Sequence, residues 1–394
     1  MVTPSQEEAW DAHALEISGR LAELARNEIA AAGGLLPFDR FMELALYAPG
    51  LGYYVAGAPK LGPGGDFVTA PEVSPLFGTC VATQCAEALG RLGGGDLMEF
   101  GPGSGALALQ VLGGLADLGT LPDHYLLLEP SPDLAARQRG AIGERFPALV
   151  HRCRWLERLP RGFRGVVVAN EVLDAMPVHR FRVVDGGPIE ECYVIQQGEG
   201  FGETWAAARS PGLSLAVTAL QSAGLATSPG YSSEVNLRLG PWIAALGASM
   251  SAGLVLLIDY GYSQSAYYQR DRTMGTLMCH ARHQAHDDPY RNVGLQDITA
   301  HVDFSAATRA GLAAGFDVAG FATQAHFLIG CGIDTLLDRV SGPYGPDLEL
   351  ALGVKQLLLP TAMGERFKVL GLTRGLDGPW CGFRVRDLSD RLWD

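Results

Sequence analysis

The fold follows from one stretch of the 394-residue chain, Asp96-Leu97-Met98-Glu99-Phe100-Gly101-Pro102-Gly103-Ser104-Gly105. Its first half predicts a short apolar strand, its second half places glycine at three alternate positions, and residues 106–112 continue as a predicted helix. Such a turn presents bare backbone N–H groups and the positive end of a helix dipole, and the missing side chains let a ligand come close. The stretch predicts a nucleotide-type cradle without naming the nucleotide, because it also fits the dinucleotide pattern G-x-G-x-x-G/A, and similar turns exist without a ligand.

Short apolar runs alternate with helical patterns beyond this turn. Continuous apolar runs are typical of strands that a parallel sheet buries on both faces. The expected strands are residues 125–129, 151–155, 165–170, 254–259, 317–323 and 367–372, and the expected helices are residues 132–146, 242–250 and 305–314. The alternation predicts an α/β fold with a doubly wound sheet whose ligands bind at the carboxyl ends of the strands.

The segments around this pattern divide the chain further. Helices are expected at residues 11–32, 37–45 and 74–89, a hairpin at 181–184 with 192–195, and a long polar loop from Tyr262 to Val302. The expected parts are an N-terminal helical cap with a binding loop (1–90), the first part of the core (91–178), an inserted subdomain (179–235) and the second part of the core (236–394).

Charge and composition exclude several classes of protein. A formal net charge of −13 argues against nucleic acid, whose binding proteins gather lysine and arginine on one face. Seven scattered cysteines without a C-x-x-C pair predict free thiols in a reducing compartment. Residues 1–10 match neither a signal peptide nor a transit peptide, and no apolar run approaches the roughly 18 residues of a membrane span. We expect a soluble cytoplasmic protein with no nucleic-acid partner and no membrane span, and a homodimer is left open.

Four strand ends are expected to meet at one cleft, and they carry Gly101 to Gly105, Glu129, Asn170-Glu171 and Asp259-Tyr260. Glu129 ends a strand where an acid accepts hydrogen bonds from ribose hydroxyls, although such an acid can also cap a helix or face solvent. Glu99 lies inside the first strand, where a buried acid needs backbone donors of the turn or a cationic ligand group. The pattern acid-x-G-x-G-x-G favours S-adenosylmethionine over a dinucleotide, because its ammonium and sulfonium groups gain from nearby carboxylates.

A second candidate segment precedes the turn. It is rich in glycine and proline and carries Gly65, Asp66 and Thr69. A backbone-permissive segment with an acid and a hydroxyl predicts a shaped binding loop, and a plain connector is the alternative.

Glu171 and Asp174 are the candidate catalytic pair. They are three residues apart where a strand gives way to a helical turn, so both carboxylates can face the same side of the cleft. Methyl transfer from a sulfonium needs mainly position and alignment. Two acids can orient a planar guanidinium and hold its charge on one side, which predicts an arginine acceptor. The alternative for Asp174 is the N-cap of a following helix.

Cys279, His280, His283 and His286 are close enough in sequence to suggest metal ligands. The neighbouring Asp287-Asp288-Pro289 indicates a loop, and no closed set of four tetrahedral ligands is present. The sequence therefore predicts no metal.

Taken together, these motifs resemble the MidA family of class I S-adenosylmethionine-dependent methyltransferases. The matching segments are Phe41-Met42 with Leu46-Tyr47 and Gly52-Tyr53-Tyr54; Gly65-Asp66-Phe67 with Thr69, Pro71-Glu72 and Phe77-Gly78; Glu99 to Gly105; Ala169-Asn170-Glu171 with Asp174-Ala175 and Pro177-Val178; Asp259-Tyr260-Gly261; and Gly275-Thr276-Leu277 with residues 297–304.

The resemblance implies a seven-stranded Rossmann-like sheet, an N-terminal helical cap and an insertion that faces the substrate. It assigns cofactor contacts to Glu99, Gly101, Gly103, Gly105 and Glu129, and Gly65 to Thr69 would cover the site. The family includes the mitochondrial arginine methyltransferase needed for respiratory complex I assembly, so it implies protein-arginine N-methylation, with a complex I subunit as one candidate substrate. A small-molecule methyltransferase and a non-catalytic assembly factor that binds S-adenosylmethionine are the alternatives. The missing transit peptide is the main departure from the mitochondrial members.

Overall fold

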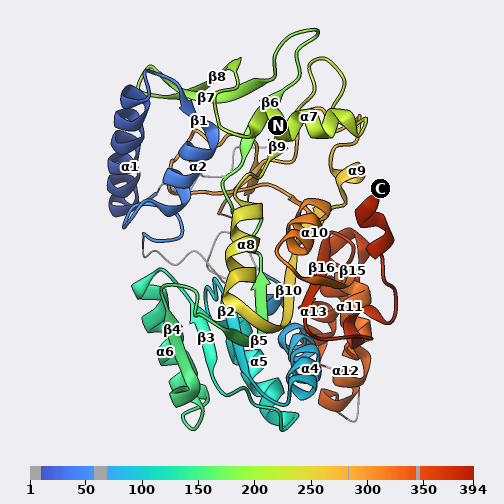
Figure 1. The fold of residues 1–394 in the computed structure, drawn as a ribbon. Helices are drawn as coiled ribbons and strands as arrows, with labels where there is room; N and C mark the ends of the chain where they lie inside the picture. The colour runs from blue at the N-terminus through green and yellow to red at the C-terminus, as the bar shows by residue number, and fades with distance from the viewer. Residues whose placement is uncertain (1–9, 57–68, 283, 343–346) are drawn as a thin grey trace.

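The large sheet of the molecule forms its lower part in Figure 1, and a smaller sheet lies above it. The structure is a computed structural model that describes residues 10–56, 69–282, 284–342 and 347–394. The strands of the large sheet are β2 (Asp96–Phe100), β3 (Tyr125–Leu128), β4 (Cys153–Leu156), β5 (Phe163–Asn170), β10 (Met250–Tyr262), β14 (Val302–Asp303), β15 (Asp317–Thr323) and β16 (Phe367–Arg374).

Seven of these strands form one continuous path, β15-β16-β10-β5-β2-β3-β4, and β14 pairs with β10 beside it. The strands from β10 to β4 are parallel, whereas β16 is antiparallel to both of its neighbours. The predicted seven-stranded sheet is therefore confirmed, and its parallel strands end at the edge that faces the upper layer.

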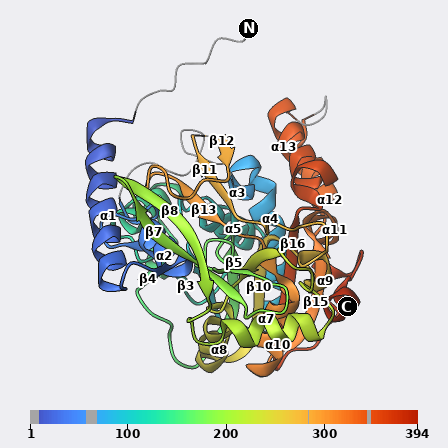
Figure 2. The same ribbon diagram turned by 90° about the horizontal axis from the view of Figure 1, so that it is seen from above.

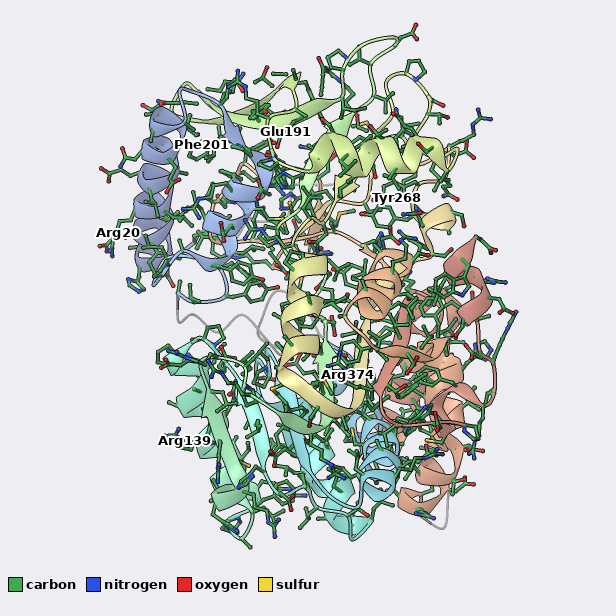
Figure 3. All side chains as sticks on the ribbon, viewed as in Figure 1. Arg20, Arg139, Glu191, Phe201, Tyr268 and Arg374 are labelled. Atoms are coloured by element: carbon green, nitrogen blue, oxygen red, sulfur yellow. The ribbon has the colours of Figure 1, made fainter. Side chains whose placement is uncertain are left out.

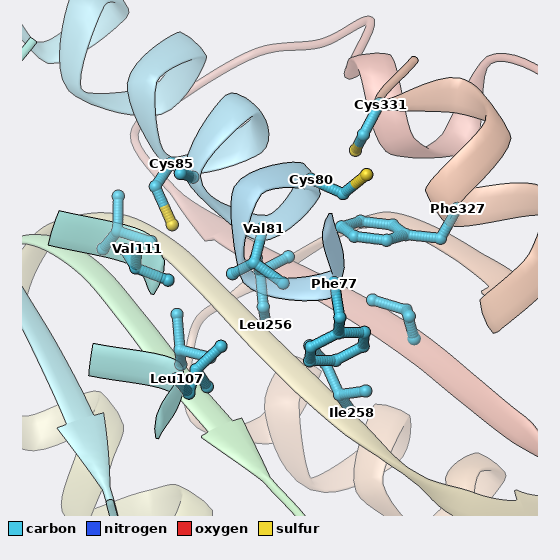
Figure 4. Close-up of a cluster of buried hydrophobic side chains, with 14 of the residues drawn as sticks. Phe77, Cys80, Val81, Cys85, Leu107, Val111, Leu256, Ile258, Phe327 and Cys331 are labelled. Atoms are coloured by element: carbon cyan, nitrogen blue, oxygen red, sulfur yellow. The ribbon is translucent and has the colours of Figure 1, made fainter. Parts of the chain in front are cut away.

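Both faces of the sheet are buried, because the middle of β5 and of β10 is a continuous apolar run. In β5, Val166 and Val168 join one buried cluster, whereas Val167 and Ala169 join the other. Figure 4 shows part of the first cluster, in which Phe77, Cys80, Val81 and Cys85 meet residues of neighbouring helices and of β10.

Helices on the two faces complete this doubly wound arrangement. The helices with residues in the first cluster are α3 (Ala70–Val73), α4 (Pro75–Leu92), α5 (Ala106–Asp117), α6 (Pro132–Arg145), α11 (Gln324–Gly330), α12 (Ile333–Val340) and α13 (Leu348–Leu358), with the short helices η2 (Pro360–Gly364) and η3 (Cys381–Phe383). Those with residues in the second cluster are α8 (Leu239–Ser249), α10 (Phe304–Ala313) and η4 (Ser389–Trp393), and η1 (Val150–Arg152) precedes β4.

The upper layer joins the N-terminus to the insertion. Its sheet has the order β1-β7-β6-β9, with β8 paired to β7. Its elements are α1 (Ala12–Ala31), β1 (Leu36–Pro37), α2 (Phe38–Tyr47), β6 (His179–Arg182), β7 (Glu190–Gln197), β8 (Gly200–Ala207), α7 (Leu213–Ser222) and β9 (Ser232–Val235). The predicted hairpin is confirmed, because β6 and β7 pair antiparallel with Phe181 opposite Glu191. Figure 2 shows α1 at one edge of this layer, with α12 and α13 on the opposite side of the molecule.

Ion pairs connect the upper layer to the core. Arg238, which precedes α8, contacts Glu43 at 2.6 Å and Asp39 at 3.1 Å, and both acids belong to α2. In Figure 3, Glu191 lies inside the upper layer, whereas Arg20 and Arg139 project outward from α1 and α6.

The prediction of a long loop from Tyr262 to Val302 is wrong. This segment contains α9 (Gln264–Tyr267) and a three-stranded sheet of β11 (Met278–Ala281), β12 (Gln284–His286) and β13 (Asp297–Thr299). Cys279 and Ile298 are fully buried against the cluster that α2 forms with the insertion. The apolar residues are too widely spaced among polar ones to form a strand pattern, so only tertiary packing reveals the strands.

No helix within the described ranges combines the length and the apolar composition that a bilayer crossing requires.

Candidate active site

The glycine turn has the predicted strand, turn and helix geometry. Gly101, Gly103 and Gly105 have φ angles of +56°, +53° and +82°, which is the left-handed region that favours glycine. Gly105 is the N-cap residue of α5, and a Cβ atom there would lie 3.3 Å from Cγ of Gln138. The N–H groups of Gly101 and Gly105 donate to the carbonyls of Leu128 and Pro102, and the missing side chains let a ligand approach the backbone at the start of a helix.

A cavity of about 340 Å³ opens at the carboxyl ends of β2, β3 and β5. Of the predicted site residues, it is lined by Thr69, Glu99, Gly101, Gly103, Glu129, Asn170 and Glu171. Gly105 and Asp174 are not among the lining residues, although each is next in the chain to one, and Gly65 and Asp66 lie outside the described residues. Strands far apart in the sequence therefore bring most of the predicted residues together.

Glu129 is held at the end of β3 by two donors. Its Oε1 accepts the backbone N–H of Ser131 at 2.9 Å, and its Oε2 accepts Nε2 of Gln138 at 3.1 Å. The same Nε2 donates to the Gly103 carbonyl at 2.8 Å, and Trp155 Nε1 donates to Gln138 Oε1 at 2.8 Å. Burial raises the pKa of Glu129. Gln138 therefore couples this acid to the glycine turn, a link that the sequence analysis missed because Gln138 is in the middle of α6.

Glu99 has a hydrogen-bond donor that the sequence analysis did not name. The phenol of Tyr125 donates to its Oε2 at 2.6 Å. Leu97 and Tyr125 are paired in the parallel register of β2 and β3, so Tyr125 shares a face with Glu99, two residues further along β2. Burial raises the pKa of Glu99 to about 7.

Glu171 and Asp174 lie on a tight turn that Asp259 holds in place. Glu171 has a φ of +52°, a conformation that costs a non-glycine residue energy. Asp259, which is fully buried at the end of β10, accepts the backbone N–H groups of Leu173 and Asp174 at 3.0 and 3.2 Å. No helix follows this turn directly, so Asp174 is not an N-cap as the alternative proposed.

Three acids lie close together here, Glu171 and Asp174 on the turn and Asp259 on β10, and all three have raised pKa values. Burial and the neighbouring charge of Asp174 raise the pKa of Glu171 to about 8, against hydrogen bonds from Asn170 and the Ala70 backbone. Burial also raises the pKa of Asp174, although Tyr260 donates to it, and the pKa of Asp259. Asp174 is 5% exposed, and its Oδ1 has no hydrogen-bond partner among the described residues. Such a group gains from a cation or a donor.

The cavity is acidic as a whole. Five carboxylates line it, and among its described lining residues there is no lysine, arginine or histidine. The carboxylates belong to Glu72, Glu99, Glu129, Glu157 and Glu171. Such a cavity favours cationic groups.

Three further lining residues were missed as site residues. Glu72 of α3 accepts the hydroxyl of Ser104 at 3.1 Å and so joins the segment before α4 to the glycine turn. Tyr47 and Tyr54 come from the upper layer. The family motifs contained all three, but only the packing of the two layers places them at the cavity.

Within the described part of the chain, no group of three or more histidine, cysteine, aspartate or glutamate side chains is arranged to hold a metal ion. Cys279 and His286 face each other across β11 and β12 rather than along a helix, and His283 lies outside the described residues.

Comparisons with known proteins agree with this geometry. Residues 80–322 match a family described as S-adenosyl-L-methionine-dependent methyltransferases. The protein arginine methyltransferase NDUFAF7, mitochondrial, of Danio rerio is 29% identical over 88% of this chain and 85% of its own length. The homologue from Drosophila melanogaster is 27% identical over 95% and 90%. The crystal structure of a COG1565 superfamily member from Burkholderia thailandensis, bound to S-adenosyl-homocysteine, has a TM-score of 0.91 and 43% identity, covering 97% of this chain and 99% of that one.

Proposed function

The chain belongs to the MidA family of S-adenosyl-L-methionine-dependent methyltransferases, and on that premise we propose that it methylates arginine side chains of a protein. The enzyme class and the cofactor predicted from the sequence are confirmed. The arginine acceptor rests on the cavity itself and on the similarity to proteins named as protein arginine methyltransferases.

The residues at the cavity fit this cofactor. The turn from Gly101 to Gly105 would receive its amino-acid portion close to the backbone, and Glu129 would accept hydrogen bonds from ribose hydroxyls. Asn170 lines the cavity with a buried Oδ1 that has no partner in the described part of the chain, so it can accept a hydrogen bond from a ligand. The bound cofactor supplies an electrophilic methyl group on a positively charged sulfur.

The observation that carries the arginine proposal is the unpartnered carboxylate oxygen of Asp174, three residues from Glu171. A guanidinium is planar, cationic and rich in N–H donors, so it matches two carboxylates that form no ion pair with any described residue. In this proposal Glu171 and Asp174 bind one edge of the guanidinium and hold its positive charge there. The nitrogen at the other edge would then be oriented toward the methyl group, and this orientation would provide the alignment that methyl transfer needs.

The proposal extends to the partner and the location. The resemblance to the MidA family supports a respiratory complex I subunit as the acceptor. A cytoplasmic location, expected from the sequence, is part of the same proposal.

The test is mass spectrometry of lysate from a strain that lacks the gene, incubated with the purified protein and isotopically labelled S-adenosylmethionine. We expect one or two labelled methyl groups on an arginine of a protein. Label found only in a small metabolite would favour the small-molecule alternative. Binding of S-adenosylhomocysteine without any transfer would favour the non-catalytic assembly factor.

A further inference from the structure

Two tyrosines of the upper layer form one wall of the cavity. Tyr47 ends α2 and Tyr54 follows in the next turn, and their rings are stacked with centroids 5.6 Å apart and an interplanar angle of 21°. Tyr47 donates its hydroxyl to the Ala175 carbonyl at 2.9 Å, and Tyr54 donates to Oδ1 of Asp297 at 2.9 Å. Both phenols are therefore anchored, which fixes the orientation of the rings.

The strand order places this wall at one end of the cavity. β5 and β3 flank β2 on opposite sides, so Glu129 and Leu156 lie toward the β4 edge, and Asn170 and Glu171 lie on the β5 side. Tyr47 contacts Ala175, which follows β5 in the chain. The tyrosine pair therefore belongs to the end that carries Glu171 and Asp174, away from the residue assigned to the ribose.

The charges around the pair favour a cation. Burial raises the pKa of both tyrosines, and the carboxylates of Asp297 and Asp174 raise it further, so the phenols stay neutral. An aromatic face attracts cations, and a guanidinium stacks on it more effectively than an ammonium because both groups are planar. A guanidinium binds favourably where carboxylates contact its edge and an aromatic ring contacts its face.

We propose that Tyr47 and Tyr54 form the subsite on which the acceptor guanidinium stacks, and that this subsite selects arginine over lysine. The inference deepens the proposed function and rests on it. Glu171 and Asp174 bind the edge of the guanidinium, and the tyrosine pair contacts its face.

The test measures binding of N-acetyl-arginine amide and N-acetyl-lysine amide to the complex of the full-length protein with S-adenosylhomocysteine, by isothermal titration calorimetry. Wild type should bind the arginine amide more tightly than the lysine amide. Tyr47→Leu and Tyr54→Leu should each weaken binding of the arginine amide roughly tenfold and reduce its advantage over lysine. Tyr47→Phe and Tyr54→Phe keep the rings and should lose much less.

Tyr290→Leu is the matched control. Tyr290 packs against the same cluster as α2 and donates its hydroxyl to Glu203 at 2.8 Å, but it does not line the cavity. Its replacement should leave arginine binding unchanged. Equal binding of the arginine amide by wild type and both leucine variants would overturn the inference, and so would a parallel loss of S-adenosylhomocysteine affinity, which would assign the pair to the cofactor. Failure of the wild-type complex to bind the arginine amide would instead contradict the arginine acceptor itself, and the inference with it.

Discussion

Glu191 in the upper sheet and Asp174 at the cavity are both buried carboxylates, with 0% and 5% of their surface exposed. Glu191 accepts hydrogen bonds from the Tyr193 hydroxyl at 2.7 Å, the backbone N–H groups of Arg209 and Ser210 at 2.9 and 3.0 Å, and the Ser210 hydroxyl. Asp174 keeps one oxygen that no residue in the described ranges contacts by a hydrogen bond.

The pKa values of the two regions move in opposite directions. Burial alone would raise the pKa of Glu191, but hydrogen bonds from His179, Ser210 and Tyr193 lower it to about 2. At the cavity, burial and neighbouring carboxylates raise the pKa of Glu171 and Asp259, and burial raises that of Asp174. The donors that Glu191 needs all come from the fold, which marks it as structural, whereas Asp174 keeps one oxygen that a ligand can use.

The largest expected effect is on turnover. Asp174→Asn and Glu171→Gln keep the shape of the turn but remove a charge that would hold the guanidinium, so kcat should fall roughly hundredfold. The affinity for S-adenosylhomocysteine, measured by calorimetry, should not change. Unaltered methylation in either variant would show that the unsatisfied acids do not act on the acceptor.

Glu191→Gln should have the opposite profile. The new side-chain amide would place N–H groups against the N–H and O–H donors that now bind the Glu191 carboxylate. The free energy of unfolding should therefore fall by about 3 kcal/mol, while the folded protein keeps its cofactor affinity. Chemical denaturation of this variant beside Asp174→Asn measures the contrast. A larger loss of stability in Asp174→Asn than in Glu191→Gln would contradict the distinction between a structural acid and a ligand-binding acid.

Glu129→Gln should affect cofactor affinity alone. Replacing one carboxylate oxygen by an amide that cannot accept a ribose hydroxyl should weaken S-adenosylhomocysteine binding roughly tenfold. The KM for the acceptor should stay constant at saturating cofactor. A change in the acceptor KM of this variant would mean that the two ends of the cavity are not separate.

The buried Glu171 also makes the stability of the protein depend on pH. The pKa of Glu171 is raised from 4.5 to about 8, so between these values the unfolded chain ionises while the folded protein retains its proton, and stability falls as pH rises. Glu171→Gln removes this cost, so the variant should gain stability relative to wild type at pH 8 compared with pH 5. Denaturation curves at the two pH values check the sign, and an equal difference from wild type at both would refute the raised pKa.

The core of this site could be predicted from the sequence because it depends on local patterns and on sheet topology. The glycine turn is a local signal, and the alternation of strands and helices brings Glu129 and Glu171 to the same edge of the sheet. The same logic does not reveal the hydrogen-bond partners. Tyr125 reaches Glu99 only because of the register between β2 and β3, and Gln138 reaches Glu129 only through the packing of α6.

The upper wall of the cavity depends on tertiary contacts that no local pattern encodes. Tyr47 and Tyr54 reach the site because the upper layer rests on the core through contacts such as Arg238 with Glu43. The strands between residues 262 and 302 were missed for the same reason, since Cys279 and Ile298 acquire their apolar surroundings from α2 and the insertion.

The most direct test of the contrast between Glu191 and the cavity acids counts protons. Titration of N-acetyl-arginine amide into the S-adenosylhomocysteine complex, at about pH 7.5 and in buffers of different ionisation enthalpy, yields the number of protons exchanged per bound arginine. If the cavity acids hold a proton until a guanidinium replaces it, binding should release on the order of one proton, and Glu171→Gln should lower that number. Arginine binding without any proton release would contradict the account, because the cavity acids would then behave like Glu191.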